Sequence, residues 1–461
     1  MLVHETSHPP FASASTLVTV TPEAAASAPS TVADAQDSEF DGVDRPDRRW
    51  DPLLVAVAVY ILTAVGRVHQ LFPILDVVHP ATMAGLVAIA CYVTNRRTER
   101  RFADILVGPT KYIAAFLVWM ILSLTGALVL ETSFDVVFGN FVKTALMFVI
   151  VAGAIRGFRD LERLAMVYLI SATLYSAVVI SRFDLGAGDA WRLGHLYYYD
   201  ANDFATFAVT ALPFGLYFLH AAERSSVRLF AALSLCILAF AFVRTGSRGG
   251  FIALVSVTVF IVLRYTAIAL RWRIAATAIV ALVVVGTASE QYWTQMGTIL
   301  SDADYNRTDE SGRMQIWRRG IGYMFQNPVF GVGPGNFQAA EGMLSSFAAR
   351  QQLGFGVRWN AAHNSYIQVG AELGIPGLVI FIGMIASTFA MLRRVNRSPW
   401  VDGDECEENP RALTNALTAS LVGFVVGAYF LSLVYAELFY TLIAMSVGLC
   451  KVAYPTRSQC D

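Results

Sequence analysis

Residues 227–264 read VRLFAALSLCILAFAFVRTGSRGGFIALVSVTVFIVLR, which is two apolar runs joined by a short basic turn. Each run approaches the length of about 20 apolar residues that an α-helix needs to cross a bilayer. Because lipid offers no partner for backbone polar groups, a segment that spans it is a helix or part of a closed barrel. The stretch therefore predicts two consecutive transmembrane helices.

The same pattern continues through most of the chain. Of its 461 residues, 56% are hydrophobic and only 15% are charged, whereas a soluble domain has about 25% charged residues. This composition excludes an ordinary soluble enzyme and a disordered protein, and a net charge of −1 gives no sign of a nucleic-acid partner. We predict an all-α, polytopic integral membrane protein with about twelve transmembrane helices. The apolar runs lie near 52–67, 80–94, 112–130, 137–155, 161–181, 201–220, 227–243, 248–264, 269–287, 364–392, 412–430 and 434–450.

These runs divide the chain into four parts. Residues 1–45 are rich in Ala, Ser, Thr and Pro without helical or strand periodicity, which predicts a disordered cytoplasmic tail. Residues 46–287 would hold transmembrane helices 1–9, and residues 288–363 a long loop. Residues 364–461 would hold helices 10–12 and a short cytoplasmic tail.

Basic residues indicate the orientation of the helices. If the N-terminus is cytoplasmic, most of the 34 lysines and arginines fall on cytoplasmic connections, as the positive-inside rule requires. Both termini are then cytoplasmic and the loop 288–363 lies outside. Loops of this length usually have a role. The expected inside residues include Arg49, Arg156, Arg224, Arg271 and Arg394.

The long loop contains a predicted helix and a predicted turn. Met314, Trp317, Ile321 and Met324 recur at three- and four-residue spacing, which predicts an amphipathic helix over 311–325. We expect this helix to lie at the outer membrane surface. The glycine-rich run 331–335 lacks the Gly-Lys-Ser/Thr of a phosphate-binding loop and predicts a tight chain reversal.

Ionisable residues at the outer membrane edge are candidates for function. Arg244 and Arg248 flank the turn between two helices, where a charge either costs several kcal/mol or finds a partner. The alternative is that they snorkel as helix caps. His363 lies where the loop re-enters the membrane, on the same side as Arg313. A lone histidine is more often structural, and Glu372, deeper in the same helix, is expected to be a buried hydrogen-bonding group.

The segment before the run 201–220 is aromatic and then polar. Tyr197, Tyr198 and Tyr199 fit an interfacial aromatic belt. Asn202 and Asp203 could instead bind sugar hydroxyls.

Several arginines and one histidine facing outward suit phosphate chemistry. Arginine binds phosphate through a bidentate fork and keeps its charge. Fixed arginines would stabilise a diphosphate as it leaves a sugar, and a neutral histidine could take the proton of an acceptor hydroxyl. The outer segments show no acidic cluster, so we expect neither a metal nor a cofactor.

The motifs together resemble the O-antigen ligase and polymerase superfamily, with matching order and spacing over about residues 180–380. They are Thr245-Gly246-Ser247-Arg248-Gly249, Arg313-x-x-x-Trp317, Asn327-Pro328-x-x-Gly331-x-Gly333-x-Gly335-x-Phe337, His363-Asn364-x-Tyr366 and Glu372-Leu373-Gly374-Ile375-x-Gly377. The family often has Asp-Pro-Asn where this chain has Asp200-Ala201-Asn202.

This resemblance implies a GT-C-like membrane glycosyltransferase in the bacterial inner membrane, with a periplasmic active site. The donor would be a glycan on undecaprenyl diphosphate. The acceptor would be a growing polysaccharide, lipid A-core or a protein hydroxyl, in surface or exopolysaccharide biosynthesis. We slightly prefer a polymerase to a ligase. Membrane lipid and other polysaccharide-assembly proteins are the further partners considered.

The resemblance also assigns roles to residues. Arg248 and Arg313 would engage the diphosphate, and His363 would activate the acceptor. Candidate substrate-binding residues are Arg244, Asn364, Trp317, Asn202 and Tyr366.

The alternative function is a secondary transporter or flippase. Transporters place ionisable groups and broken helices near the midplane, often in paired repeats. Here the candidate groups cluster at the outer edge and the two halves show no obvious match. A purely structural scaffold would leave the outer arginines unexplained.

Overall fold

The computed structural model describes residues 49–95, 100–182, 191–193, 199–300, 309–310, 312–346, 348, 350, 359–398 and 410–454. The predicted tail 1–45 and two of the tyrosines before the run 201–220 lie outside these residues. Within the described residues the chain is helical, with no β-strand, as the composition predicts.

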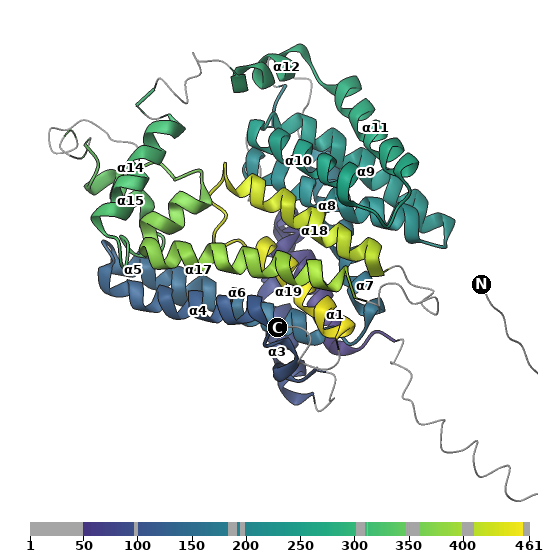
Figure 1. Cartoon of the computed structure of the whole chain (residues 1–461), viewed down its shortest axis with the longest axis horizontal. Coiled ribbons are helices and arrows are strands. Elements are labelled where there is room, and N and C mark those ends of the chain that lie inside the picture. The colour runs from purple at the N-terminus through teal and green to yellow at the C-terminus, as the bar shows by residue number, and fades with distance from the viewer. Residues whose placement is uncertain are drawn as a thin grey trace, which may run out of the picture. The chain divides into compact units, whose positions relative to one another are not determined.

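Up to α12 most helices follow one another with short connections, and residues 183–200 separate α7 from α8 (Figure 1). Their bounds are α1 Pro52–Tyr60, η1 Ile61–Val65, η2 Val68–Leu71, α2 Pro73–Asp76, α3 Pro80–Thr94, η4 Phe102–Ile105, α4 Gly108–Ser123, η5 Leu124–Gly126, α5 Leu130–Phe134, η6 Asp135–Phe141, α6 Val142–Ala154, α7 Phe158–Arg182, α8 Ala201–Ala221, α9 Ser225–Thr245, α10 Arg248–Arg264, α11 Leu270–Thr287, α12 Glu290–Gly297, η7 Thr298–Leu300, α14 Arg313–Gln326, α15 Phe337–Met343, α17 Ser365–Val395, α18 Pro410–Ala428 and α19 Glu437–Ala453.

Every predicted apolar run coincides with a helix or with a continuous group of helical turns. Among the described residues, eight helices are long and apolar enough to cross a membrane. The first two runs form shorter apolar helices, Pro52–Val65 and Pro80–Thr94. Helices α10 and α19 have 17 residues each. The protein is therefore a polytopic helical membrane protein, while the number of twelve spans stays a prediction.

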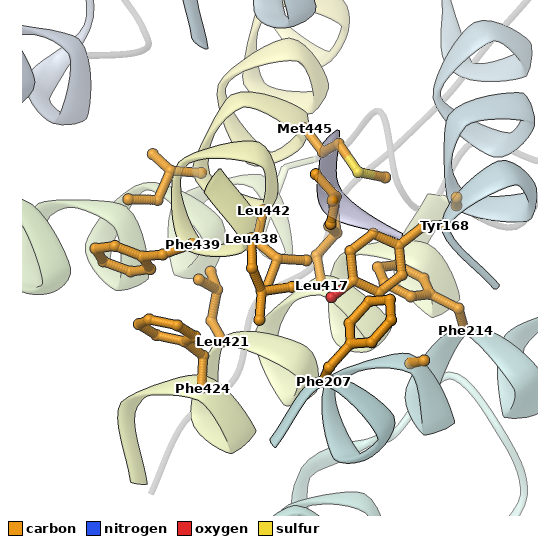
Figure 2. Packing of buried hydrophobic residues seen from close by; sticks show 14 of the residues in the cluster. Tyr168, Phe207, Phe214, Leu417, Leu421, Phe424, Leu438, Phe439, Leu442 and Met445 are labelled. Carbon is orange, nitrogen blue, oxygen red and sulfur yellow. The ribbon is translucent and has the colours of Figure 1, made fainter. Parts of the chain in front are cut away.

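The core is formed by α7, α8, α18 and α19. Figure 2 shows aromatic and aliphatic side chains from these helices packed together. Phe424 and Phe439 stack with ring centroids 4.5 Å apart, and the Tyr168 hydroxyl lies 2.7 Å from that of Thr210. In α8, 83% of the apolar window is buried, against 6% in α11. A helix that is apolar on all sides belongs inside the bundle, so α8 is central and α11 is peripheral.

A network of charged residues closes the end of the bundle where α7 begins. Asp51 caps α1 and lies 2.5 Å from a nitrogen of Arg100. Asp160 accepts from Arg156 at 2.7 Å and from Arg163 at 3.0 Å. The three arginines of this network are among the basic residues predicted to be cytoplasmic. The candidate functional site lies at the opposite end, where α9 ends and α10 begins.

The predicted loop helix is confirmed as α14, Arg313–Gln326. Its buried face consists of Ile316, Gly320 and Tyr323, whereas Met314 and Ile321 are exposed. Gly320 permits this packing, because a Cβ there would lie 2.6 Å from Ile367. Of the apolar row read from the sequence, Met314 and Ile321 therefore face away from the protein, whereas Trp317 and Met324 contact it.

The glycine-rich run after α14 is a chain reversal, as predicted. Gly331, Gly333 and Gly335 all have positive φ, which glycine adopts without steric cost. The run packs where α17 breaks at Gly374, whose φ is 70°. The Gly333 amide donates to the Glu372 carbonyl at 2.9 Å, and the Ile375 amide donates to the Pro328 carbonyl at 2.8 Å. The loop thus satisfies the backbone of a broken helix. Figure 1 shows α14 and α15 beside α17.

Candidate functional site

The turn between α9 and α10 presents Arg248. Gly246 ends α9 in the left-handed conformation, with φ 57°. The Ser247 hydroxyl caps α10 by accepting from the Gly250 amide at 3.1 Å, and Arg248 is the first residue of the helix. Its Nη1 donates to the Thr298 hydroxyl at 2.8 Å. Local capping chemistry therefore fixes where this guanidinium emerges.

His363 lies immediately before α17 and outside the helix. Its φ is 46°, a value that non-glycine residues adopt uncommonly. Its backbone amide donates to the Ser432 hydroxyl at 3.0 Å. The following residue, Asn364, caps α17 by accepting from the amides of Tyr366 and Ile367, both at 3.0 Å. The imidazole thus projects from a backbone held on both sides, and such strained positions cluster at functional sites.

The turn between α18 and α19 contacts both the start of α10, which carries Arg248, and the backbone of His363. Gly249 packs so tightly on it that a Cβ would lie 2.6 Å from the Cβ of Phe430. Two residues further along, Ser432 accepts from His363. Ser365 donates to the Leu431 carbonyl at 2.7 Å. The start of α10 and the start of α17, distant in the sequence, therefore border the same turn.

Arg313, the first residue of α14, acts electrostatically on His363. Burial lowers the pKa of the His363 imidazole below its ordinary value of 6.5, and the positive charge of Arg313 lowers it further. The negative charge of Asp200 acts in the opposite direction. Burial and the charge of Arg313 both favour the neutral imidazole, which is therefore available as a proton acceptor at neutral pH.

Three predicted substrate-binding residues make structural contacts around His363. Trp317 donates from Nε1 to the Ala362 carbonyl at 3.0 Å. Tyr366 donates from its hydroxyl to the Val425 carbonyl at 2.9 Å. Asn364 is 1% exposed and uses its Oδ1 as the helix cap. These contacts hold the backbone of His363, so they give the three residues a positioning role. Direct contact with substrate stays a prediction.

The other two predicted binding residues lie near the α9–α10 turn. Arg244 packs its guanidinium over the Phe240 ring at 5.2 Å, and its buried Nε has no hydrogen-bond partner among the described residues. Asn202 accepts from Nη2 of Arg192 at 3.4 Å, and Arg192 also donates from Nε to the Thr245 carbonyl at 2.6 Å. Arg192 therefore links Asn202 to the turn that carries Arg248.

A second arginine of α14 supports the loop. Arg319 makes a bidentate ion pair with Glu341, with contacts of 2.6 and 2.8 Å. The Tyr323 hydroxyl donates to the same carboxylate at 2.8 Å. The hydrogen bond to Glu341 raises the pKa of Arg319, although its burial acts against this. Because Glu341 is only 1% exposed, this ion pair holds α14 against α15.

Glu372 is the buried hydrogen-bonding residue that the sequence predicts. Its carboxylate accepts from the Tyr435 hydroxyl at 2.7 Å and from the Gly335 amide at 2.9 Å. It also accepts from Nε2 of Gln368 at 3.2 Å and from the Phe337 amide at 3.3 Å. This one side chain therefore ties the glycine-rich run to α17 and to the segment before α19.

Sequence reasoning missed four residues that shape the site. Asp200, Thr298 and Ser432 contact or influence the proposed catalytic residues, and Arg192 bridges Asn202 to the turn. Only Asp200 carried a signal, because an aspartate just before an apolar run is a typical helix cap. The other three are recognisable only once distant segments are brought together.

No group of three or more His, Cys, Asp or Glu side chains that could hold a metal ion occurs in the part of the chain that the structure describes. Independence of metal ions stays a prediction. What the described residues offer is several guanidinium groups, those of Arg248 and Arg313 among them, and one largely buried imidazole at the same end of the bundle.

Comparison with known proteins finds a similar family for part of the chain. No curated protein matches the chain. A model of the O-antigen ligase family matches residues 205–382, the segment that contains Arg248, Arg313 and His363. The resemblance drawn from the motifs is confirmed over this segment, because residues 205–382 of this integral membrane protein are similar to the O-antigen ligase family.

Proposed function

We propose that the chain transfers a glycan from undecaprenyl diphosphate to an acceptor hydroxyl on the periplasmic side of the bacterial inner membrane. The observation that supports this most is the surroundings of His363. Its imidazole lies under the influence of Arg313 and borders the turn on which the helix of Arg248 packs. A base beside phosphate-binding cations is what glycosyl transfer from a diphosphate requires.

The proposed reaction is a single displacement at the anomeric carbon. The bond between this carbon and the diphosphate oxygen breaks, and the lipid diphosphate leaves with the electron pair. A bond forms between the anomeric carbon and the acceptor oxygen, whose proton passes to His363. Arg248 and Arg313 stabilise the charge that develops on the leaving diphosphate. Arginine does this without a metal ion, because its fork binds phosphate oxygens bidentately.

The remaining predicted residues have supporting roles in this proposal. Trp317, Asn364 and Tyr366 hold the segment that presents His363. Arg244 and Asn202 lie by the α9–α10 turn and would contact the donor. We retain the slight preference for a polymerase, with a growing polysaccharide as acceptor and lipid A-core as the acceptor of the ligase alternative.

The transporter alternative gains no support from the family that matches. Within the described residues, the break of α17 at Gly374 is a feature typical of transporters. In this chain, however, the backbone of residues 328–333 occupies the hydrogen-bonding groups at the break. The broken helix therefore serves as an attachment point for the loop.

The test is the size of lipid-linked glycans in a deletion strain, with wild type and His363→Ala for rescue. Accumulation of single repeats on the lipid would mean a polymerase. Long lipid-linked chains that never reach an acceptor would mean a ligase. An unchanged lipid-linked pool would refute the proposed function.

A further inference from the structure

A cavity lies next to the α9–α10 turn. Its volume is about 320 Å³. One wall is the indole of Trp191, and the other is the short helix α12 with the first residue of η7. The lining residues are Trp191, Glu290, Gln291, Thr294, Gln295 and Thr298. We call this cavity the α12 groove.

Helix α12 has two distinct faces. Tyr292 and Met296, four residues apart, are buried against the protein. The groove side carries Gln291, Thr294, Gln295 and Thr298, which recur at three- and four-residue spacing and so share one face of the helix. This face therefore presents a continuous row of amide and hydroxyl groups to the groove.

Trp191 is held in place by the α9–α10 turn. Gly246 leaves room for its ring, because a Cβ there would lie 2.8 Å from the Cζ–Cη edge of the indole. The next two residues are fixed to the end of α9: Arg192 donates to the Thr245 carbonyl at 2.6 Å, and the Leu193 amide donates to the Arg244 carbonyl at 2.8 Å. Gly246 of the Thr-Gly-Ser-Arg motif therefore has two roles: it adopts the backbone conformation of the turn and it leaves space for the Trp191 ring.

The chemistry of the groove differs from that of the arginine site. Its lining contains no lysine or arginine and only one charged residue, Glu290, so it is poorly suited to a phosphate. Amides and hydroxyls donate and accept hydrogen bonds as sugar hydroxyls do. An indole offers a flat apolar surface with a polar edge, on which the C–H face of a sugar ring can pack. These features match an uncharged carbohydrate.

One residue joins the groove to the proposed catalytic machinery. The Thr298 hydroxyl lines the groove, accepts from Arg248 at 2.8 Å and donates to the Gln295 carbonyl at 2.7 Å. A ligand whose diphosphate is bound by Arg248 would therefore have its adjacent sugars at the mouth of the groove. We propose that the α12 groove binds the sugar residues next to the diphosphate of the donor, an inference that rests on the proposed function.

The experiment uses the purified full chain in detergent. The probe is the free oligosaccharide released by mild acid from the lipid-linked glycan of the deletion strain, and binding is measured by titration calorimetry. Trp191→Ala should weaken binding about tenfold, which is about 1.4 kcal/mol. Trp191→Phe should bind nearly as wild type does, because it keeps an aromatic plane. In transfer assays Trp191→Ala should raise KM for the lipid-linked donor and leave kcat within about twofold.

Two variants act as controls. Trp293→Ala removes a tryptophan that is 42% exposed on the same helix but does not line the groove, and it should bind as wild type does. Gln291→Ala alters an exposed groove residue without touching the packing at Gly246. It should weaken binding even if Trp191→Ala fails to fold.

The outcomes separate this inference from the proposed function. His363→Ala should abolish transfer and still bind the oligosaccharide. If wild type binds the oligosaccharide but transfers no glycan, the proposed function fails and the groove stands. If wild type does not bind it, or if Trp191→Ala and Gln291→Ala both bind as tightly as wild type, the groove is refuted whatever the transfer assays give.

Discussion

The positive charge of Arg313 lowers the pKa of His363, although Arg313 begins α14 and His363 directly precedes the residue that caps α17. Burial acts in the same direction and Asp200 against it. A cation and an anion of the same protein therefore act on the imidazole in opposite directions. Substitution of Arg313 or of Asp200 is therefore expected to change the pKa of His363, in opposite directions.

The first prediction concerns the pH dependence of transfer. A general base must be neutral, so the acidic limb of kcat/KM follows the pKa of His363 in the free enzyme. Arg313→Gln removes a charge that favours the neutral form, so the pKa rises and the limb moves to higher pH. Asp200→Asn removes a charge that favours protonation, so the limb moves to lower pH, while asparagine preserves the helix cap.

Arg313→Lys is the matched control for this prediction. It keeps the positive charge and leaves the limb in place. Its rate should still fall, because an ammonium group cannot reproduce the bidentate fork. Shifts of the same sign in Arg313→Gln and Asp200→Asn would contradict the arrangement of the three residues.

The second prediction concerns His363 itself. His363→Asn should lower kcat by about 10²- to 10⁴-fold, the usual contribution of a general base. Asparagine tolerates positive φ better than most residues, so this variant preserves the backbone that His363→Ala would disturb. Transfer rates measured at equal amounts of membrane-inserted protein test it. Full activity would remove His363 from the mechanism.

The third prediction concerns the packing of Gly246. Gly246→Ala should lower the free energy of unfolding by about 1–2 kcal/mol from its left-handed backbone alone. The contact with the Trp191 ring adds to this loss. Gly286→Ala is the control, because no atom lies within 4 Å of its Cβ position. It should leave stability unchanged or raise it by up to about 1 kcal/mol, since alanine favours helix.

Thermal unfolding in detergent compares the two glycine variants. Equal midpoints for Gly246→Ala and Gly286→Ala would contradict both the left-handed conformation of Gly246 and its close contact with Trp191.

The fourth prediction concerns Glu372. Glu372→Ala leaves the Tyr435 hydroxyl and the amides of Gly335 and Phe337 without their acceptor, at about 1–3 kcal/mol for each donor that stays buried. The glycine-rich run should then become sensitive to limited proteolysis. Glu372→Gln keeps one acceptor oxygen and should be milder. Equal protease resistance in wild type and Glu372→Ala would refute the role of this carboxylate.

The fifth prediction concerns topology. A reporter fused after Met343, an exposed residue at the end of α15, should read as periplasmic. A reporter fused after Arg397, beyond the end of α17, should read as cytoplasmic. If both reporters read as the same side of the membrane, the predicted topology is wrong.

The helices could be predicted from the sequence because a bilayer imposes the length and polarity of each span. Every apolar run is helical, and the α9–α10 turn follows from Gly246 and Ser247. The packed face of α14 was not predictable in this way. Periodicity identifies the most apolar face of a helix, whereas contact with other helices here depends on the smallest residue, Gly320.

The site could be predicted only where its chemistry is local or follows from the family resemblance. Arg248, Arg313 and His363 stand at helix ends, where charge and position are visible in the sequence. Thr298 and Ser432 were missed, because a lone hydroxyl has no pattern and its partner is distant in the chain. Tertiary contacts of this kind depend on packing that no local rule encodes.

The break of α17 at Gly374 also limits how substrates can reach the site. The amides of Val332 and Gly333 occupy the carbonyls freed by the break, and the Trp119 indole occupies that of Leu373 at 2.9 Å. Swinging this part of the loop outward would break these hydrogen bonds, and each donor or acceptor left buried without a partner costs about 1–3 kcal/mol. Residues 328–337 are therefore a fixed wall and not a lid, so donor and acceptor must arrive around it.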